Sequence, residues 1–294
     1  MVSLYGEPLQ KYDDNFELYL DPAAEHQIEL RLKNFTPPAS GNIDMTSMTA
    51  DEAQTTILAA LATGFTELKL TGELSKIGMG GNWGTFINNK KITKCDLTGV
   101  TGWGRTPTLP ELAFMNCTAL QEVTLPDDVR VIGSSAFFGC AALTTVNLSQ
   151  VTWINLNAFY ECTSLEMLIL DNVTEIGREV FYGCTSLKTL KIPKCTRFGN
   201  YIVTGCKALT RIEATATGDF LDIIGNSSIE NYAVFHNRDT HSGENAFAPA
   251  RCDLVLNTDK QEDGTAVPKV SGNNRWTLAA NASPMMWKSI TFRQ

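Results

Sequence analysis

The middle of the chain repeats one pattern of apolar and polar positions about every 22 residues. Five cysteines mark the repeat: Cys117, Cys140, Cys162, Cys184 and Cys206. An apolar residue precedes each cysteine by three positions (Phe114, Phe137, Phe159, Phe181 and Val203), and a leucine follows each by three (Leu120, Leu143, Leu165, Leu187 and Leu209). Self-similarity at a fixed short period predicts a solenoid, in which neighbouring coils cover each other's apolar faces.

Each copy also carries one short strand. In the copy around Cys184, the residues Leu187, Leu190 and Ile192 predict a strand that ends in alternating apolar and polar positions and has one buried face. Stacked coils then form a parallel sheet with strands roughly 4.8 Å apart. A turn and a second apolar anchor follow each strand, and the phenylalanine–cysteine corner closes the coil. We expect the phenylalanines to form a continuous column through the core.

Weaker copies flank the regular ones. Phe86 stands in the phenylalanine position of an earlier copy, so residues 92–97 predict an earlier strand. Residues 65–70 predict one still earlier, and residues 252–256 predict a degenerate last coil. The solenoid therefore comprises about eight coils between residues 60 and 256.

Different patterns predict how the ends of the core are covered. Two alternating runs, 15–20 and 27–32, predict a hairpin. Thr49 and Glu52 form a capping-box pattern ahead of an apolar run, which predicts a short helix. We divide the chain into an N-terminal hairpin-like segment at 1–48, the solenoid at 49–256 with a helical cap at 50–62 and an insertion at 226–245, and a C-terminal capping segment at 257–294.

Composition and charge narrow the classes of function. The net charge is −8 and no basic run occurs, which argues against a nucleic-acid partner or an anionic membrane surface. No run of about 18 apolar residues occurs, so we expect no membrane span. No signal peptide is visible after Met1. We therefore expect either an intracellular protein or a signal that is absent from this sequence.

The eight cysteines pose a choice between disulfides, zinc ligands and buried thiols. Five share one column, and Cys95, Cys195 and Cys252 occupy apolar positions elsewhere in the repeat. Because a buried free cysteine behaves as a small hydrophobe, we expect buried thiols. Cysteines stacked in one column have parallel Cβ vectors, which is poor disulfide geometry. No Cys-x-x-Cys pair supports a zinc site.

Two copies show the unit at its most regular. They read Gly133-Ser134-Ser135-Ala136-Phe137-Phe138-Gly139-Cys140 and Phe181-Tyr182-Gly183-Cys184-Thr185-Ser186-Leu187. This unit resembles the BspA-like leucine-rich repeats of bacterial surface proteins, and the resemblance extends over residues 50–294 apart from 226–245. It implies a right-handed leucine-rich-repeat solenoid of the α/β class, with a parallel β-sheet on one face, few short helices and capped ends. It also implies a secreted or surface-anchored protein, often a lipoprotein, involved in adhesion.

Side chains at the outward positions of the strands form the first candidate binding surface, the strand face. Its two columns are Glu122, Thr145, Met167, Thr189 and Arg211, and Thr124, Asn147, Ile169, Lys191 and Glu213. Met167 and Ile169 place an apolar spot in the middle of a mixed polar surface, as in the hot spots of protein interfaces. The alternative is an inert, solvated sheet.

The second candidate is the aromatic column that follows the phenylalanines: Phe138, Tyr160 and Tyr182. Aromatic rings spaced by one coil are suited to stacking on sugars or gripping a partner. The alternative is that these rings pack only against each other at the coil corner.

Two polar segments offer weak support for a chemical site. The 226–245 insertion contains His236, Asp239 and His241, without a nucleophile elbow or a metalloprotease spacing. The glycines at 78–84 lack the lysine and the following helix that phosphate binding needs. We therefore expect no catalytic residue, no metal site and no cofactor. The insertion stays a candidate interaction loop, because long loops in compact repeats are often functional.

Three hypotheses about function follow. The first is a non-enzymatic cell-surface or secreted protein that mediates adhesion by binding an extracellular host protein or glycan. The second is a passive structural or spacer module of a surface assembly, and the third is an enzyme with its site in the 226–245 loop. We expect an extracellular or outer-surface location, with any signal or lipoprotein anchor absent from this sequence, and a monomer as the default.

Overall fold

The computed structural model describes residues 16–20, 28–32, 38–79, 84–215, 251–257 and 289–293. The chain divides into two compact units, Met1–Ala39 and Ser40–Gln294. In the first unit, β1 (Phe16–Leu20) pairs antiparallel with β2 (Ile28–Leu32), as the alternating pattern predicts. The 226–245 insertion and its histidines lie outside the described residues.

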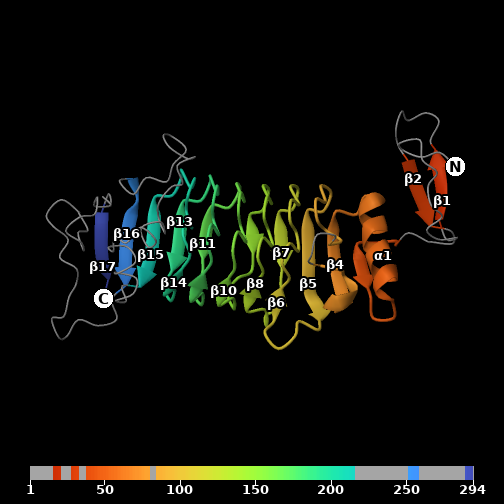
Figure 1. Cartoon of the computed structure of the whole chain (residues 1–294), viewed down its shortest axis with the longest axis horizontal. Coiled ribbons are helices and arrows are strands. Elements are labelled where there is room, and N and C mark those ends of the chain that lie inside the picture. Colours follow the sequence, from red (N-terminus) through yellow and green to blue (C-terminus); the bar gives the residue numbers. More distant parts are fainter. Residues whose placement is uncertain are drawn as a thin grey trace. The chain divides into compact units, whose positions relative to one another are not determined.

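The second unit is a row of stacked coils with parallel strands, the solenoid predicted from the repeat (Figure 1). One sheet contains β3 (Asn42–Asp44), β4 (Glu67–Glu73), β5 (Lys94–Thr101), β7 (Glu122–Thr124) and β9 (Thr145–Val146). A second contains β11 (Met167–Ile169), β13 (Thr189–Ile192), β15 (Arg211–Thr215), β16 (Asp253–Asn257) and β17 (Ser289–Arg293). These two sheets carry the strand face.

A third parallel sheet forms where the sequence predicts only an apolar anchor. Its two-residue strands are β6 (Thr108–Leu109), β8 (Val131–Ile132), β10 (Trp153–Ile154), β12 (Glu175–Ile176) and β14 (Arg197–Phe198). Coils in this region therefore join their neighbours along this sheet and at the phenylalanine corner, and along the strand face except between β9 and β11.

The N-terminal end of the solenoid is covered by α1 (Ala50–Ala62), followed after β4 by the short helix η1 (Leu74–Lys76). The predicted capping box is present, because the backbone amide of Thr49 donates to Glu52 over 2.8 Å and the Glu52 amide donates back to the Thr49 hydroxyl. Ile57 and Leu61 of α1 belong to the buried core. β3 precedes the helix and pairs with β4, so the solenoid sheet begins inside the segment that the sequence assigns to the hairpin.

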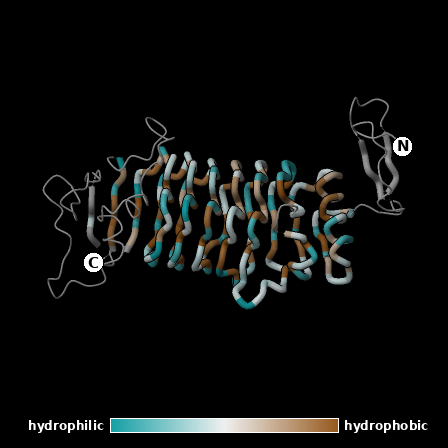
Figure 2. Tube along the Cα trace, in the orientation of Figure 1, coloured by the Kyte–Doolittle hydropathy of each residue, from teal (hydrophilic) through white to brown (hydrophobic). Residues whose placement is uncertain are grey.

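The phenylalanine column runs through the core as predicted. It consists of Phe86, Phe114, Phe137, Phe159 and Phe181, all fully buried. Successive ring centroids lie 5.1, 5.6, 5.1 and 6.1 Å apart, and the rings are stacked. Figure 2 shows apolar residues recurring from coil to coil at corresponding places. Burial of each ring is worth roughly 1.5–3 kcal/mol, so this column is a large part of what holds neighbouring coils together.

Each corner needs two residues with a left-handed backbone. At the corner of Phe181, Glu179 has φ 56° and Gly183 has φ 71°. The second position lies directly before the cysteine, and glycine adopts this conformation without steric cost. The backbone therefore explains the recurrent Gly-Cys pair of the repeat.

The cysteines are buried free thiols, as the sequence predicts. Each thiol of the repeated column donates to the carbonyl of a phenylalanine in the preceding coil: Cys117 to Phe86 (2.8 Å), Cys140 to Phe114 (3.0 Å), Cys162 to Phe137 (3.1 Å), Cys184 to Phe159 (3.2 Å) and Cys206 to Phe181 (3.0 Å). The same residue type thus fills a small apolar space and satisfies a buried backbone oxygen. Burial raises the pKa of the Cys117 and Cys184 thiols to about 12.

Phe137→Ala tests the phenylalanine column. Losing a ring stacked on both sides leaves a cavity, so the free energy of unfolding should fall by about 3–5 kcal/mol, measured by denaturant titration. Met167→Ala, which shortens an exposed side chain, should change it by about 0.5 kcal/mol or less. Similar small effects for both variants would contradict the role given to the column.

Thiol labelling tests the burial of the cysteines. At about pH 8 the native protein should react slowly with a disulfide reagent, whereas all eight thiols should react once the protein is unfolded, because only the thiolate of an accessible thiol attacks. Thr145→Cys adds an exposed thiol as the positive control. Rapid labelling of the unmodified native protein would show that the column is open to solvent.

The raised pKa values also predict how stability depends on pH. An unfolded thiol has a pKa of about 8.5, so above that pH the unfolded chain has lost protons that buried Cys184 still holds. The stabilisation is complete below about pH 8.5 and falls as the pH rises toward 12. Between about pH 7.5 and pH 10 the free energy of unfolding of the unmodified protein should fall. In Cys184→Ala this fall should be smaller by about 2 kcal/mol, measured by denaturant midpoints. An unchanged pH slope would contradict this linkage.

Candidate functional site

The strand face is built by the alternation of side chains along each strand. In β11, Leu168 points into the core while Met167 and Ile169 are 60% and 48% exposed. These two are the apolar residues that the sequence places at the centre of the surface. The structure therefore brings them together on one strand and leaves both accessible.

The two coils directly before β11 present mostly uncharged polar side chains to this surface, with the half-buried Glu122 as the exception. Thr145 is exposed, and Thr124 and Asn147 are half-buried. Asn147 is already engaged, because its side chain accepts from the Leu125 amide over 2.6 Å and donates to the Leu125 carbonyl over 2.8 Å. Asn147 thus ties β9 to the preceding coil and contributes less to a free binding surface than its position in the sequence suggests.

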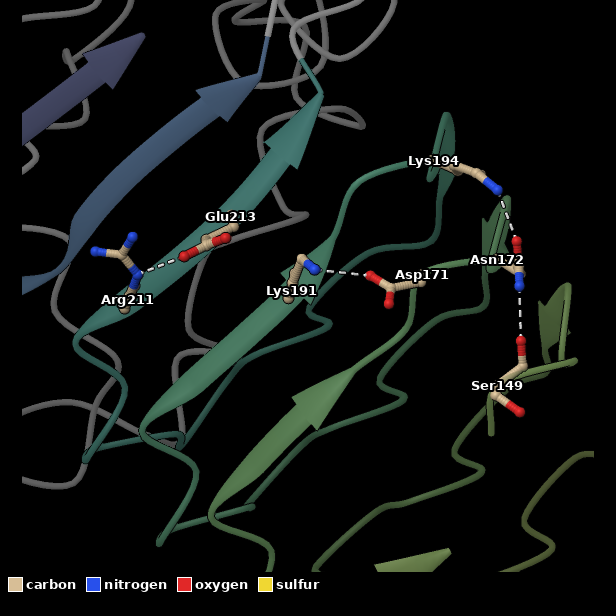
Figure 3. A network of polar contacts seen from close by, with 7 residues as sticks. All are labelled: Ser149, Asp171, Asn172, Lys191, Lys194, Arg211 and Glu213. Atoms are coloured by element: carbon tan, nitrogen blue, oxygen red, sulfur yellow. Dashed lines mark hydrogen bonds and ion pairs between the residues drawn. The ribbon is translucent and has the colours of Figure 1, made fainter. Parts of the chain in front are cut away.

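The coils from β11 onward present charged side chains that pair with each other. Lys191 lies 3.0 Å from Asp171, and Arg211 lies 2.6 Å from Glu213 (Figure 3). Next to them, Lys188 pairs with Glu166 over 2.8 Å. The exposed pair of Lys188 and Glu166 contributes little stability. The consequence of these pairs for binding is that the charges beside Met167 are neutralised within the protein.

The remaining residues of the network in Figure 3 link three successive turns after the strands. Lys194 donates to the Asn172 side chain over 2.6 Å, and Asn172 donates to the Ser149 carbonyl over 2.7 Å. These bonds hold the turns at one edge of the strand face in register.

The strand face is interrupted between β9 and β11, which lie in different sheets. At the coil before, the Gln121 carbonyl accepts from the amides of Thr144 and Thr145 over 2.9 and 3.1 Å. At the coil after, the Glu166 carbonyl accepts from the Lys188 amide over 2.8 Å. Within the described part of the chain, no backbone hydrogen bond joins residues 141–150 to residues 163–172. We call this interruption the β9/β11 opening.

A pocket of about 220 Å³ occupies the opening. Its lining residues are Thr144, Thr145, Val146, Leu148, Phe159, Leu165, Met167, Leu168 and Ile169. The pocket thus extends from the exposed strand face toward Phe159 of the phenylalanine column. Nothing in the sequence marks it, because Leu143, Val146 and Leu148 keep the same spacing as the neighbouring copies.

The aromatic column forms a close stack. The ring centroids of Phe138 and Tyr160 lie 4.6 Å apart, and those of Tyr160 and Tyr182 lie 4.4 Å apart. Tyr182 is buried, whereas Phe138 and Tyr160 are half-buried. Burial and the neighbouring Tyr182 raise the pKa of Tyr160 well above its ordinary value. The ring faces inside the stack are therefore occupied, and the edges of Phe138 and Tyr160 are the accessible parts.

Sequence reasoning missed one exposed apolar pair, Trp153 and Leu156. Trp153 stands at the first position of β10, in register with Val131 of β8 and Glu175 of β12. The signal was present, since a tryptophan occupies a position that is polar in the following copies. Trp153 lies on the third sheet and Leu156 in the turn that follows β10, so neither belongs to the strand face.

The described residues offer no place for a metal ion or a membrane anchor of the helical kind. Among them, no group of three or more histidine, cysteine or acidic side chains is arranged to hold a metal. The helices found in this part of the chain are too short or too polar to cross a membrane. On the strand face, the described side chains offer apolar contact, hydrogen bonding and paired charge.

Several solved structures are similar to this chain. They include the leucine-rich-repeat protein of T. pallidum (25% identity, TM-score 0.34), the pneumococcal vaccine antigen PcpA (17%, 0.35) and a leucine-rich cell surface protein of Faecalibacterium prausnitzii (19%, 0.31). The matches cover 48%, 63% and 71% of this chain and 61%, 38% and 55% of those proteins, which is less than two thirds of each. A comparison with curated proteins finds no significant match.

The repeat itself matches a known family over part of the chain. Residues 85–216 match the family described as BspA type leucine rich repeat region, in six copies. This interval contains the phenylalanine column and the five-membered cysteine column on which the expected resemblance rests. Over this interval, a little less than half of the chain, the repeats are therefore similar to BspA-type leucine-rich repeats.

Proposed function

We propose that the protein is a non-enzymatic bacterial surface or secreted protein that adheres to an extracellular host protein or glycan through its strand face. One observation carries the proposal. Met167 and Ile169 are large apolar side chains that are exposed to solvent at the centre of a polar surface. The charged side chains beside them are paired with each other. A central apolar anchor with a polar rim is how the energetically dominant part of an interface is built.

The charges support the same assignment. Because Lys188 and Lys191 are paired with acidic neighbours, the surface offers no strong field to steer a highly charged partner. Affinity then depends on apolar burial at Met167. A passive spacer would have no use for this exposure, since solenoid surfaces tolerate polar residues freely while the core register holds the fold.

The non-enzymatic assignment and the location are supported by the family. Proteins with BspA-type repeats are typically bacterial surface proteins and generally act as scaffolds. No catalytic residue is assigned in this proposal.

Met167→Glu tests the strand face as the adhesive surface. The purified protein is passed over immobilised extracellular-matrix proteins, mucins and glycans, and binding is measured by surface plasmon resonance. Placing a carboxylate at the apolar centre should weaken binding by roughly 30-fold, equivalent to about 2 kcal/mol. Leu58→Glu is the matched control, because Leu58 on α1 is 47% exposed and lies outside the strand face.

Tyr160→Ala in the same assay separates the strand face from the aromatic column. The proposal expects Tyr160→Ala to bind normally once its folding has been verified by circular dichroism. Loss in Tyr160→Ala with retention in Met167→Glu would move the adhesive surface to the aromatic column. No binding by folded protein across the whole panel would favour the passive structural module.

A further inference from the structure

The β9/β11 opening interrupts one face of the solenoid and leaves the other two intact. On the third sheet, β10 pairs with β8 and β12, and the Thr174 amide donates to the Thr152 carbonyl over 2.8 Å. At the corner, the Phe137 amide donates to the Ala158 carbonyl over 2.8 Å. The coils are therefore held in register on these two faces. Side-chain bonds from Thr163 to the Ala141 carbonyl (3.1 Å) and from Asn172 to the Ser149 carbonyl (2.7 Å) also join them at the ends of the opening, while β9 and β11 separate between these bonds.

The separation leaves backbone groups without partners on both sides. By analogy with the coils before and after, the Thr144 carbonyl should accept from the amides of Glu166 and Met167. None of these three groups makes a hydrogen bond to any described residue. One side of the opening thus presents an acceptor and the other side presents two donors.

The separation also exposes the core between the strands. Val146 is only partly buried, whereas the residues at the same strand position in β7, β13 and β15 (Val123, Leu190 and Ile212) are fully buried. Val146 and Leu148 on one side face Met167 and Leu168 across the pocket, with Phe159 among the lining residues. An apolar group in this pocket would restore the contacts that the missing strand pairing removes.

Size and hydrogen bonding together define the occupant. The pocket of about 220 Å³ is smaller than the roughly 300–1,000 Å³ typical of small-molecule sites, so it takes one large side chain. The unpaired groups beside it match the alternating donors and acceptors of an extended peptide backbone, as in strand addition. On the β11 side of the pocket, Glu166 and Asp171 are already paired with lysines, which favours an uncharged segment there.

We propose that the β9/β11 opening binds an extended, uncharged segment of a protein partner, seats one aromatic or large aliphatic side chain in the pocket and hydrogen-bonds to the segment's backbone. This inference rests on the proposed function and narrows it to a peptide ligand with a defined anchor. Thr144, Thr145 and Val146 form one side of the site, and Glu166 and Met167 form the other.

A blocked pentapeptide, acetyl-Thr-Thr-Phe-Thr-Thr-amide, is the probe. It is titrated into the full chain labelled with nitrogen-15, and amide signals are followed by NMR. The amides of Glu166 and Met167 should shift saturably. Replacing the probe's phenylalanine by alanine should weaken binding at least about tenfold, because the anchor is lost. N-methylation of the probe's phenylalanine should also weaken binding, because it removes a backbone donor.

Three variants of the protein locate the site. Val146→Phe fills the pocket from inside, and Thr145→Arg places an unpaired charge at its exposed lip; both should abolish saturable binding. Thr106→Arg is the matched control, since Thr106 is exposed and lies outside both the strand face and the pocket, and it should bind normally. Should Val146→Phe fail to fold, Thr145→Arg against Thr106→Arg decides, because both positions are exposed.

The outcomes separate this site from the broader proposal. Equal binding of the phenylalanine and alanine probes, no saturable shift, or normal binding by Thr145→Arg would overturn the peptide site. A matrix protein that loses affinity for Met167→Glu and keeps it for Thr145→Arg would leave the adhesive strand face standing without this pocket. If the pentapeptide binds but no matrix protein, mucin or glycan of the panel does, the result would support the peptide site and count against the wider adhesion proposal. If a glycan binds at the pocket and the pentapeptide displaces it, the assignment of the site to a peptide ligand would be overturned.

Discussion

The contact between neighbouring coils at the phenylalanine corner is what the rest of the structure depends on. A single coil has too little apolar surface to bury its own ring, so each ring is buried by the rings before and after it. The thiol of Cys162 also donates to the Phe137 carbonyl of the preceding coil, so a hydrogen bond joins the two coils at the same corner where their rings pack. Because the corner fixes how one coil sits on the next, it also fixes which strand residues point inward and which face solvent.

This dependence explains why so much of the fold could be predicted from the sequence. A column that must stack permits only large apolar residues at its position, so Phe137 and its counterparts reveal the period and, with it, the strands and the buried thiols. β3 and the third sheet were missed for the same reason. β3 has no partner copy in the sequence. The two-residue strands such as β10 do recur with the repeat, but they are too short to show an alternating pattern and are defined by hydrogen bonds between coils.

Some features of the candidate site could likewise be predicted from the sequence, and others could not. Alternation along β11 was enough to predict that Met167 and Ile169 lie outside, because the side chain direction in a strand is set by its neighbours in sequence. The engagement of Asn147 with Leu125 and the opening beside Val146 were not predictable, because both depend on how far one coil lies from the next. Identical leucine and valine spacings in paired and unpaired strands carry no information about that distance.

A solenoid can open one face because its coils are joined along several. In an ordinary sheet, separating two central strands would divide the core, whereas here the bonds of β10 to β12 and the stacking of Phe137 on Phe159 continue across the same pair of coils. The cost falls on three unpaired backbone groups and a partly exposed Val146, all at the surface where water or a ligand is able to reach them. The rigid opening presents unpaired hydrogen-bonding groups next to exposed apolar surface. A peptide strand would satisfy both, so the missing strand pairing that makes the sheet less stable here also makes it able to bind.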